Sequence, residues 1–157
     1  MTSGPAIVGL NEIETFSPRT RFANQPKRLA GARDMVFCCG LTVLSTHLGL
    51  DRSERAVQIA ELKRIVKAEK DQVILMGDFN CGTDQLAPLD ELLTDTGELF
   101  GSRPTYPDDN PTDRIDYILI SPQIICLDLS SPFSDASDHL PVMAELELLK
   151  PIESVRD

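Results

Sequence analysis

Two histidines, several aspartates and one asparagine are the residues of this chain best suited to acid–base or metal chemistry. The chain contains only two histidines, His47 and His139. Asp78 and Asn80 lie two residues apart, directly after the apolar run of residues 73–76. A carboxylate accepts a proton or binds a cation, whereas a carboxamide donates a hydrogen bond, which suits a phosphoryl oxygen. Because such a run predicts a buried strand, both side chains are expected where that strand ends.

Each of these residues also has a purely structural interpretation. Asp78 and Asn80 could form a turn, since both residue types favour turns. His47 ends the apolar segment of residues 41–45 and could simply cap that strand with a hydrogen bond. The combination of all these residues in one short chain favours a functional site.

Asp116 lies within a second apolar segment, where burying an unpaired charge is costly. Either Asp116 pairs with Arg114 or Arg103, or it orients the ring of His139, as carboxylates do in acid–base pairs. We favour the second interpretation.

Asp138 and His139 directly precede the last apolar segment. In the structural interpretation, Ser137 and Asp138 form a cap there. In the functional one, His139 is the general base or contacts the transition state, and Asp138 is a metal ligand. A site rich in oxygen and without thiols indicates Mg²⁺ or Mn²⁺.

The apolar pattern predicts an order of elements in which strands dominate. Asp51 and Glu54 have the spacing of a capping box, so a helix should start there and continue to about Ala68. A hairpin is expected from residues 35–37 and 41–45, and a short helix from residues 89–93. The remaining strands are predicted at residues 73–76, 114–120, 124–129 and 141–148, with a long surface loop at residues 102–113.

Four segments, in their order along the chain, resemble the endonuclease/exonuclease/phosphatase superfamily, the deoxyribonuclease I-like metal-dependent phosphodiesterases. They are Thr46-His47-Leu48, Gly77-Asp78-Phe79-Asn80, Arg114-Ile115-Asp116-Tyr117 and Ser137-Asp138-His139. The matching stretch runs from about Leu41 to about Glu147. The resemblance implies an α+β fold, the four-layer α/β/β/α sandwich of that superfamily.

The resemblance also implies roles for the site residues. His47 and Asn80 would contact the scissile phosphate. Asp78 would position or deprotonate the attacking water, or bind a metal. Asp116 would orient His139, and Asp138 would be a further ligand of the Mg²⁺ or Mn²⁺ ion.

The chain departs from the family pattern before His47. The family has a longer first half that brings an asparagine and a metal-binding glutamate, and Asn11-Glu12 lacks the strand that should precede that glutamate. We therefore predict a single domain over residues 1–157 that corresponds to the C-terminal half to two-thirds of the sandwich, truncated at its N-terminal side. An inactive half-domain that acts as a binding or assembly module is the alternative. Such a half would expose a sheet face, through which two copies could pair.

Three further segments are less specific. Arg55 and Gln58 are typical of one branch of the family, but a solvated helix face is our default for them. Thr105-Tyr106-Pro107 resembles the substrate-side loop, where Tyr106 either stacks on the substrate or packs within the loop. Cys81 is expected to be a packed bystander.

Composition limits the classes of partner. The chain has 157 residues and a net charge of −10, which argues against a broad surface for polyanions but not against a phosphate site centred on a metal. No apolar run approaches the ~20 residues of a membrane span, and no signal peptide is visible, so we expect a cytoplasmic protein with reduced cysteines. The substrate class stays open among nucleic acid, a phospholipid head group and a small phosphodiester.

Overall fold

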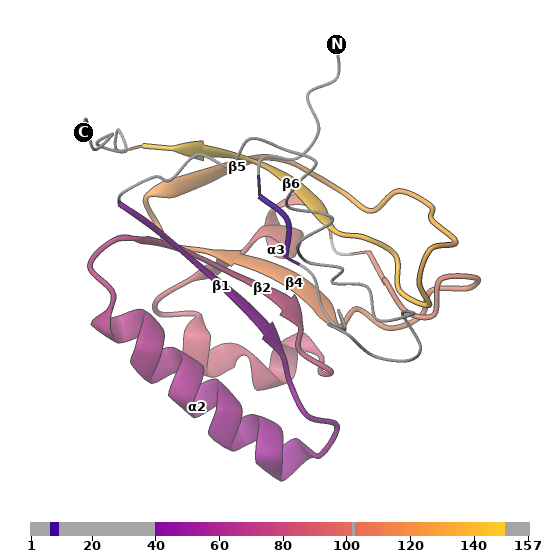
Figure 1. The fold of residues 1–157 in the computed structure, drawn as a ribbon, viewed down its shortest axis with the longest axis horizontal. Coiled ribbons are helices and arrows are strands. Elements are labelled where there is room, and N and C mark those ends of the chain that lie inside the picture. The colour runs from indigo at the N-terminus through magenta and orange to yellow at the C-terminus, as the bar shows by residue number, and fades with distance from the viewer. Residues whose placement is uncertain (1–6, 10–39, 102, 150–157) are drawn as a thin grey trace, which may run out of the picture.

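The computed structural model describes residues 7–9, 40–101 and 103–149, and these form an α+β arrangement of stacked layers. A four-stranded sheet lies in the middle, helix α2 (Arg52–Ala68) covers one face, and a two-stranded sheet covers the other (Figure 1). None of the helices in this described part combines the length and the hydrophobicity that a bilayer crossing requires.

The central sheet has the strand order β1-β2-β4-β3. Strand β1 (Leu41–His47) pairs in parallel with β2 (Gln72–Asp78), and α2 connects the two. Strand β4 (Asp116–Ile120) runs antiparallel to β2 on its other side, and the short β3 (Thr94–Asp95) pairs with β4. The C-terminal ends of β1 and β2 and the N-terminal end of β4 therefore meet at the same edge of the sheet.

The second sheet is an antiparallel pair of β5 (Ile124–Ser130) and β6 (Met143–Leu148). Its inner face contributes Cys126, Ala144 and Leu146 to a core against the central sheet. Its outer face exposes the large side chains of Ile125, Leu127 and Met143. The strand predicted at residues 141–148 is thus found as β6, with one face packed and one face exposed.

Alternation along the central strands separates the two cores. Val73 and Leu75 of β2 pack in the core that includes α2, whereas Ile74 packs in the core between the two sheets. Successive side chains of a strand point to opposite faces, so even-numbered positions of β2 face the second sheet. This assignment carries through to the strand end, where the predicted site residues lie.

Helix α2 begins where its sequence predicts. Asp51 is the N-cap, and its carboxylate accepts hydrogen bonds from the backbone N–H groups of Ser53 and Glu54. Ile59 and Val66 of this helix are buried in the core against the central sheet. The predicted helix and its capping residue are confirmed.

Two local predictions were wrong. Residues 89–93 do not form an α-helix: a 3₁₀-helix, η2 (Ala87–Leu89), is followed by turns, and Leu89 and Leu93 are both buried in the core. A second 3₁₀-helix, η1 (Thr83–Gln85), precedes it. Helix α3 (Thr96–Phe100) was missed, although Asp95 caps it with a hydrogen bond from Gly97. The signal was available, because Asp95 and Glu98 repeat the spacing of Asp51 and Glu54.

Strand β1 has a partner in the described part that the sequence did not indicate. We expected a hairpin with residues 35–37, which lie outside the described residues. In the described part, β1 pairs in parallel with β2. The interpretation of Asn11-Glu12 and the expected reduced state of Cys38 and Cys39 also concern residues outside the described part.

Gly77 allows β1 and β2 to approach at the edge that carries the site. It pairs with Thr46 and has a φ of 141°, and a Cβ atom added there would lie 1.9 Å from the carbonyl oxygen of Thr46. We expect Gly77→Ala to lower the free energy of unfolding by about 3 kcal/mol, because it combines backbone strain with a clash against rigid backbone. Urea denaturation of the purified protein measures this loss.

Gly40→Ala is the matched control. Gly40 also has a positive φ, of 88°, but an added Cβ would meet no atom of the described residues within 4 Å. It should cost only the strain of the left-handed conformation, about 1 kcal/mol. Equal losses for the two variants would show that the close approach at Gly77 is not limiting.

Candidate active site

Three of the predicted site residues form a row across the central sheet. In the strand register, His47 pairs with Asp78, and Asp78 pairs with Asp116. The alternation of β2 and β4 directs Asp78 and Asp116 toward the face covered by the second sheet. The sheet therefore brings together three residues that are separated by 31 and 38 positions in the sequence.

His47 and Asp78 are in direct contact. The Nε2 atom of His47 lies 3.4 Å from the Oδ2 atom of Asp78, and the carboxylate is buried while the imidazole is partly exposed. An imidazole beside a buried carboxylate can offset its charge when protonated, or donate to a bound oxygen when neutral.

The turn after β2 is held by Phe79 and Asn80. Phe79 is fully buried, with its ring edge-on to Tyr117 at 5.4 Å between centroids. Asn80 adopts a φ of 50°, its backbone N–H donates to the Oδ1 atom of Asp78, and its side-chain amide donates to the carbonyl of Leu48 at 2.8 Å. One amide hydrogen of Asn80 thus binds the segment after His47, which leaves its other N–H as the donor for the predicted phosphate contact.

His139 joins the row through Asp116. The Nδ1 atom of His139 lies 2.8 Å from the Oδ2 atom of Asp116. The hydroxyl of Thr105 donates to the same oxygen at 2.6 Å. When Nδ1 carries the proton, the Nε2 atom of the neutral ring is the atom left to accept one, which is the geometry of a carboxylate-oriented base.

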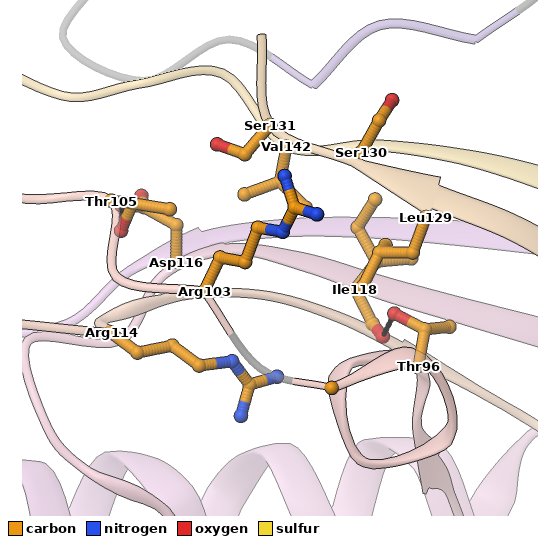
Figure 2. A pocket seen from close by; sticks show the side chains of 11 residues that line it. Thr96, Arg103, Thr105, Arg114, Asp116, Ile118, Leu129, Ser130, Ser131 and Val142 are labelled. Carbon is orange, nitrogen blue, oxygen red and sulfur yellow. Dashed lines mark hydrogen bonds between the residues drawn. The ribbon is translucent and has the colours of Figure 1, made fainter.

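The structural alternative for Asp116 was an ion pair with an arginine. Arg114 instead forms a bidentate pair with Asp95, at 2.5 and 2.8 Å, and its guanidinium stacks over the ring of Tyr117. Arg103 lies with Asp116 and Thr105 at an open hollow, and its side chain extends toward Ser131, which directly follows β5 (Figure 2). Within the described part of the chain, the carboxylate of Asp116 is hydrogen-bonded to His139 and Thr105.

Asp138 lies apart from the cluster. Among the described residues, the ligand atoms of Asp78, Asp116 and His139 lie within 4.8 Å of one another, and Asp138 is not in this group. The carboxylate of Asp138 is exposed and accepts a hydrogen bond of 3.4 Å from Ser137. The structure thus brings together Asp78, Asp116 and His139, and it leaves Asp138 at the rim.

The electrostatics of the cluster favour a bound cation. Burial raises the pKa of Asp78, and the charge of Asp116 raises it further, while the N–H of Asn80 and the two imidazoles act in the opposite direction. Two neighbouring carboxylates with an imidazole form a hard, oxygen-rich donor set, which suits a divalent cation. The residues present therefore fit such an ion.

The pKa of His139 is raised. Burial of the ring disfavours the charged form, but the hydrogen bond to Asp116 outweighs it, together with the negative charges of Asp116, Asp78 and Asp138. His139 therefore holds a proton more tightly than a free histidine does.

Arg55 and Gln58 were underestimated from the sequence. Arg55 is buried, and it donates to the carbonyls of Gly49 and Leu50 at 3.1 and 2.5 Å, while Gln58 accepts from the N–H of Gly49 at 2.9 Å. The default of a solvated helix face is wrong for Arg55. Its contacts hold the loop that follows His47, and a lone arginine on a helix gives no local signal for them.

Tyr106 and Cys81, which the sequence also singles out, lie in the loops that carry site residues. Tyr106 lies with its ring centroid 4.8 Å from that of His139, so its ring packs on the histidine. Cys81 is buried and not in a disulfide, in agreement with its expected role as a packed residue.

Comparisons with known proteins identify related sequences and folds. A family model described as the Endonuclease/Exonuclease/phosphatase family matches residues 4–139. No curated protein matches the chain significantly.

Solved structures share the fold. An endonuclease/exonuclease/phosphatase from Beutenbergia cavernae is 27% identical, with a TM-score of 0.57 over 69% of this chain and 36% of that one. The mannosyl-6-phosphatase of Bacteroides thetaiotaomicron is 23% identical, with a TM-score of 0.52 over 68% and 51%. The D. rerio TDP2 complexed with a single strand DNA product is 22% identical, with a TM-score of 0.56 over 68% and 56%. This chain thus spans about half the length of such structures or less, and the deoxyribonuclease I-like fold is confirmed for the part that it covers.

The raised pKa of His139 predicts how the metal-free protein responds to pH. The folded protein binds this proton more tightly than the unfolded chain, so the pair stabilises the fold fully below about pH 6.5, and the stabilisation is lost as pH rises through the folded pKa. In the presence of a metal chelator, an NMR titration should give a pKa of His139 above the ordinary value for histidine. Asp116→Asn should lower that pKa, and the free energy of unfolding should then fall less steeply as the pH rises.

The NMR signals are simple to assign because the chain has two histidines, and a His47→Gln variant leaves the ring signals of one histidine. An unchanged pKa of His139 in Asp116→Asn would contradict the coupling of the two side chains.

Proposed function

Because the chain belongs to the Endonuclease/Exonuclease/phosphatase family, we propose that it is a divalent-metal-dependent hydrolase that cleaves a phosphoester, with phosphodiesters as the preferred class, by attack of water. The observation that carries this proposal is the 2.8 Å contact between His139 and Asp116 beside the buried carboxylate of Asp78. A carboxylate-oriented imidazole next to a second carboxylate supplies a base and a place for cationic charge, which water attack on a phosphoester requires.

We assign His139 as the base that takes the proton of the attacking water at its Nε2 atom. Asp116 holds the ring by its Nδ1 atom and stabilises the imidazolium that forms. Asp78 orients the water from the neighbouring strand end. His47 and Asn80 donate to the phosphoryl oxygens, where negative charge builds in the transition state.

Asp78 is the residue that we propose to hold the metal, with Asp138 contributing from the rim. A bound Mg²⁺ or Mn²⁺ would neutralise negative charge on the phosphoryl group. Asp78 suits this role because it is buried beside a second carboxylate, so that its ionised form gains from a nearby cation.

The alternative function is a catalytically inactive module that binds or assembles with a partner. The separation of Asp138 from the cluster of Asp78, Asp116 and His139 favours this alternative. The outer face of β5 and β6 would then be the assembly surface, since it exposes Ile125, Leu127 and Met143 among the described residues. Pairing of two copies through this face remains a proposal.

The assigned base predicts a large loss of activity on substitution. With Mg²⁺ or Mn²⁺ present, the protein should hydrolyse bis(p-nitrophenyl) phosphate, and His139→Ala should lower kcat/KM by about 10²- to 10⁴-fold because the general base is removed. Release of p-nitrophenolate measures the rate.

Arg64→Gln is the matched control for this assay, because Arg64 lies on the exposed side of α2 and, among the described residues, pairs with Glu61 alone. It should retain full activity. Equal rates for His139→Ala and the unsubstituted protein would overturn the assignment.

Metal binding at Asp78 predicts a stability signature that does not depend on turnover. In the presence of a metal chelator, Asp78→Asn should raise the midpoint temperature of thermal unfolding, since it removes a charge that burial disfavours. Added Mn²⁺ should stabilise the unsubstituted protein, by about 2.7 kcal/mol at 100 times the Kd, and should stabilise Asp78→Asn far less.

Asp135→Asn is the control, since Asp135 is an exposed aspartate in the same loop as Asp138. It should keep the response to Mn²⁺, whereas Asp138→Asn should reduce it. No stabilisation of the unsubstituted protein by millimolar Mn²⁺ or Mg²⁺ would favour the inactive module.

A further inference from the structure

We propose that Thr105 is a positioning residue that holds the Asp116 carboxylate in the orientation in which it binds His139. The proposal rests on the proposed function, and it adds to the site an uncharged residue that is hydrogen-bonded to Asp116. Four sets of contacts lead to it.

The side chain of Thr105 is buried and directed at the pair. Thr105 is only 1% exposed, and its Oγ1 atom lies 2.6 Å from the Oδ2 atom of Asp116. An ionised carboxylate only accepts hydrogen bonds, so the hydroxyl must be the donor. Figure 2 shows the two side chains facing each other where the loop passes the start of β4.

Thr105 and His139 contact the same oxygen of Asp116. The Oδ2 atom of Asp116 accepts from the Thr105 hydroxyl and also contacts the Nδ1 atom of His139 at 2.8 Å. A carboxylate has a broad preference in its terminal torsion, so one hydrogen bond leaves it free to rotate. A second donor, fixed on a buried β-branched side chain, defines which oxygen faces the histidine.

The backbone of Thr105 holds the other partner of the pair. Its carbonyl accepts from the N–H of Leu140 at 2.8 Å, and its own N–H donates to the carbonyl of Asp113 at 2.9 Å. On the other side of His139, the N–H of Asp108 donates to the carbonyl of Asp138 at 2.9 Å. The loop of residues 103–113 therefore fixes the segment of His139 on both sides.

The ring of His139 is restrained by the same loop. Tyr106 follows Thr105 directly and packs on the histidine ring, with 4.8 Å between the centroids. One short stretch of the loop thus sets both the ring plane of His139 and the carboxylate that it meets. A residue whose role was only to stabilise the loop would need neither the hydroxyl nor its direction.

The kinetic test compares Thr105→Val with Thr105→Ser. Valine keeps the shape and removes the hydroxyl, so kcat on bis(p-nitrophenyl) phosphate should fall by about 10- to 100-fold with little change in KM, the range found for groups that orient a ligand or base. Serine keeps the donor and should recover most of the rate. A fall caused by general destabilisation would not be rescued selectively by serine.

A double-substitution cycle separates an action through Asp116 from a direct one. If Thr105 acts through Asp116, adding Thr105→Val to Asp116→Asn should lower kcat little further. Full additivity of the two losses would overturn the proposal.

A readout independent of activity keeps this inference distinct from the proposed function. In metal-free protein, the Nδ1–H proton of His139 in contact with Asp116 should give a downfield NMR signal, assigned by its loss in Asp116→Asn. Thr105→Val should weaken it or move it upfield, and Thr105→Ser should keep it. If the signal behaves so but no phosphoester is cleaved, the proposed function fails and the positioning role stands.

Two outcomes would overturn the positioning role. One is a Thr105→Val protein that folds, as judged by its circular dichroism, and keeps both the signal and kcat. The other is a loss of both readouts in Thr105→Ser as well. If Thr105→Val does not fold, Thr105→Ala, which relaxes any steric strain at this buried position, provides the same comparison with serine.

Discussion

The pairing of β2 with a strand on each side is the constraint on which the rest of the site depends. Its register with β1 sets His47 beside Asp78, and its register with β4 sets Asp116 on the other side. A shift of one residue in either pairing would turn side chains to the opposite face, into the core against α2. Gly77 makes the pairing with β1 close enough, because its Cα lies where a side chain would meet the backbone of Thr46.

This register concentrates negative charge at one strand end, and the surrounding residues offset it. Asp78 is buried beside Asp116, and each carboxylate has an imidazole as its neighbour. The turn at Asn80 adds a backbone donor to Asp78, and the loop before β4 adds the hydroxyl of Thr105 to Asp116. Such a donor set is held by hydrogen bonds and fits a divalent cation, as the proposed metal-dependent hydrolysis would require.

The elements that could be predicted are those with strong local signals. Strand β2 was evident from an apolar run, and α2 from its capping aspartate and helical spacing, because both signals lie within the element itself. Helix α3 was missed because five residues show little periodicity, and residues 89–93 were misassigned because their leucines are buried by tertiary packing. The sequence favours a solvated Arg55 for the same reason: its acceptors include two carbonyls of a loop, which leave no pattern in the sequence.

The sequence alone determined which residues stand at the strand ends, since the apolar runs and the polar residues that follow them are local properties of the chain. It could not determine which atoms meet. The tertiary structure decided that β1 runs parallel to β2, that Asp116 contacts His139 rather than Arg114, and that Asp138 stays at the rim. These outcomes depend on strand register and on how two loops pack, and such distances between residues far apart in the chain arise only when the sheet and its loops are assembled.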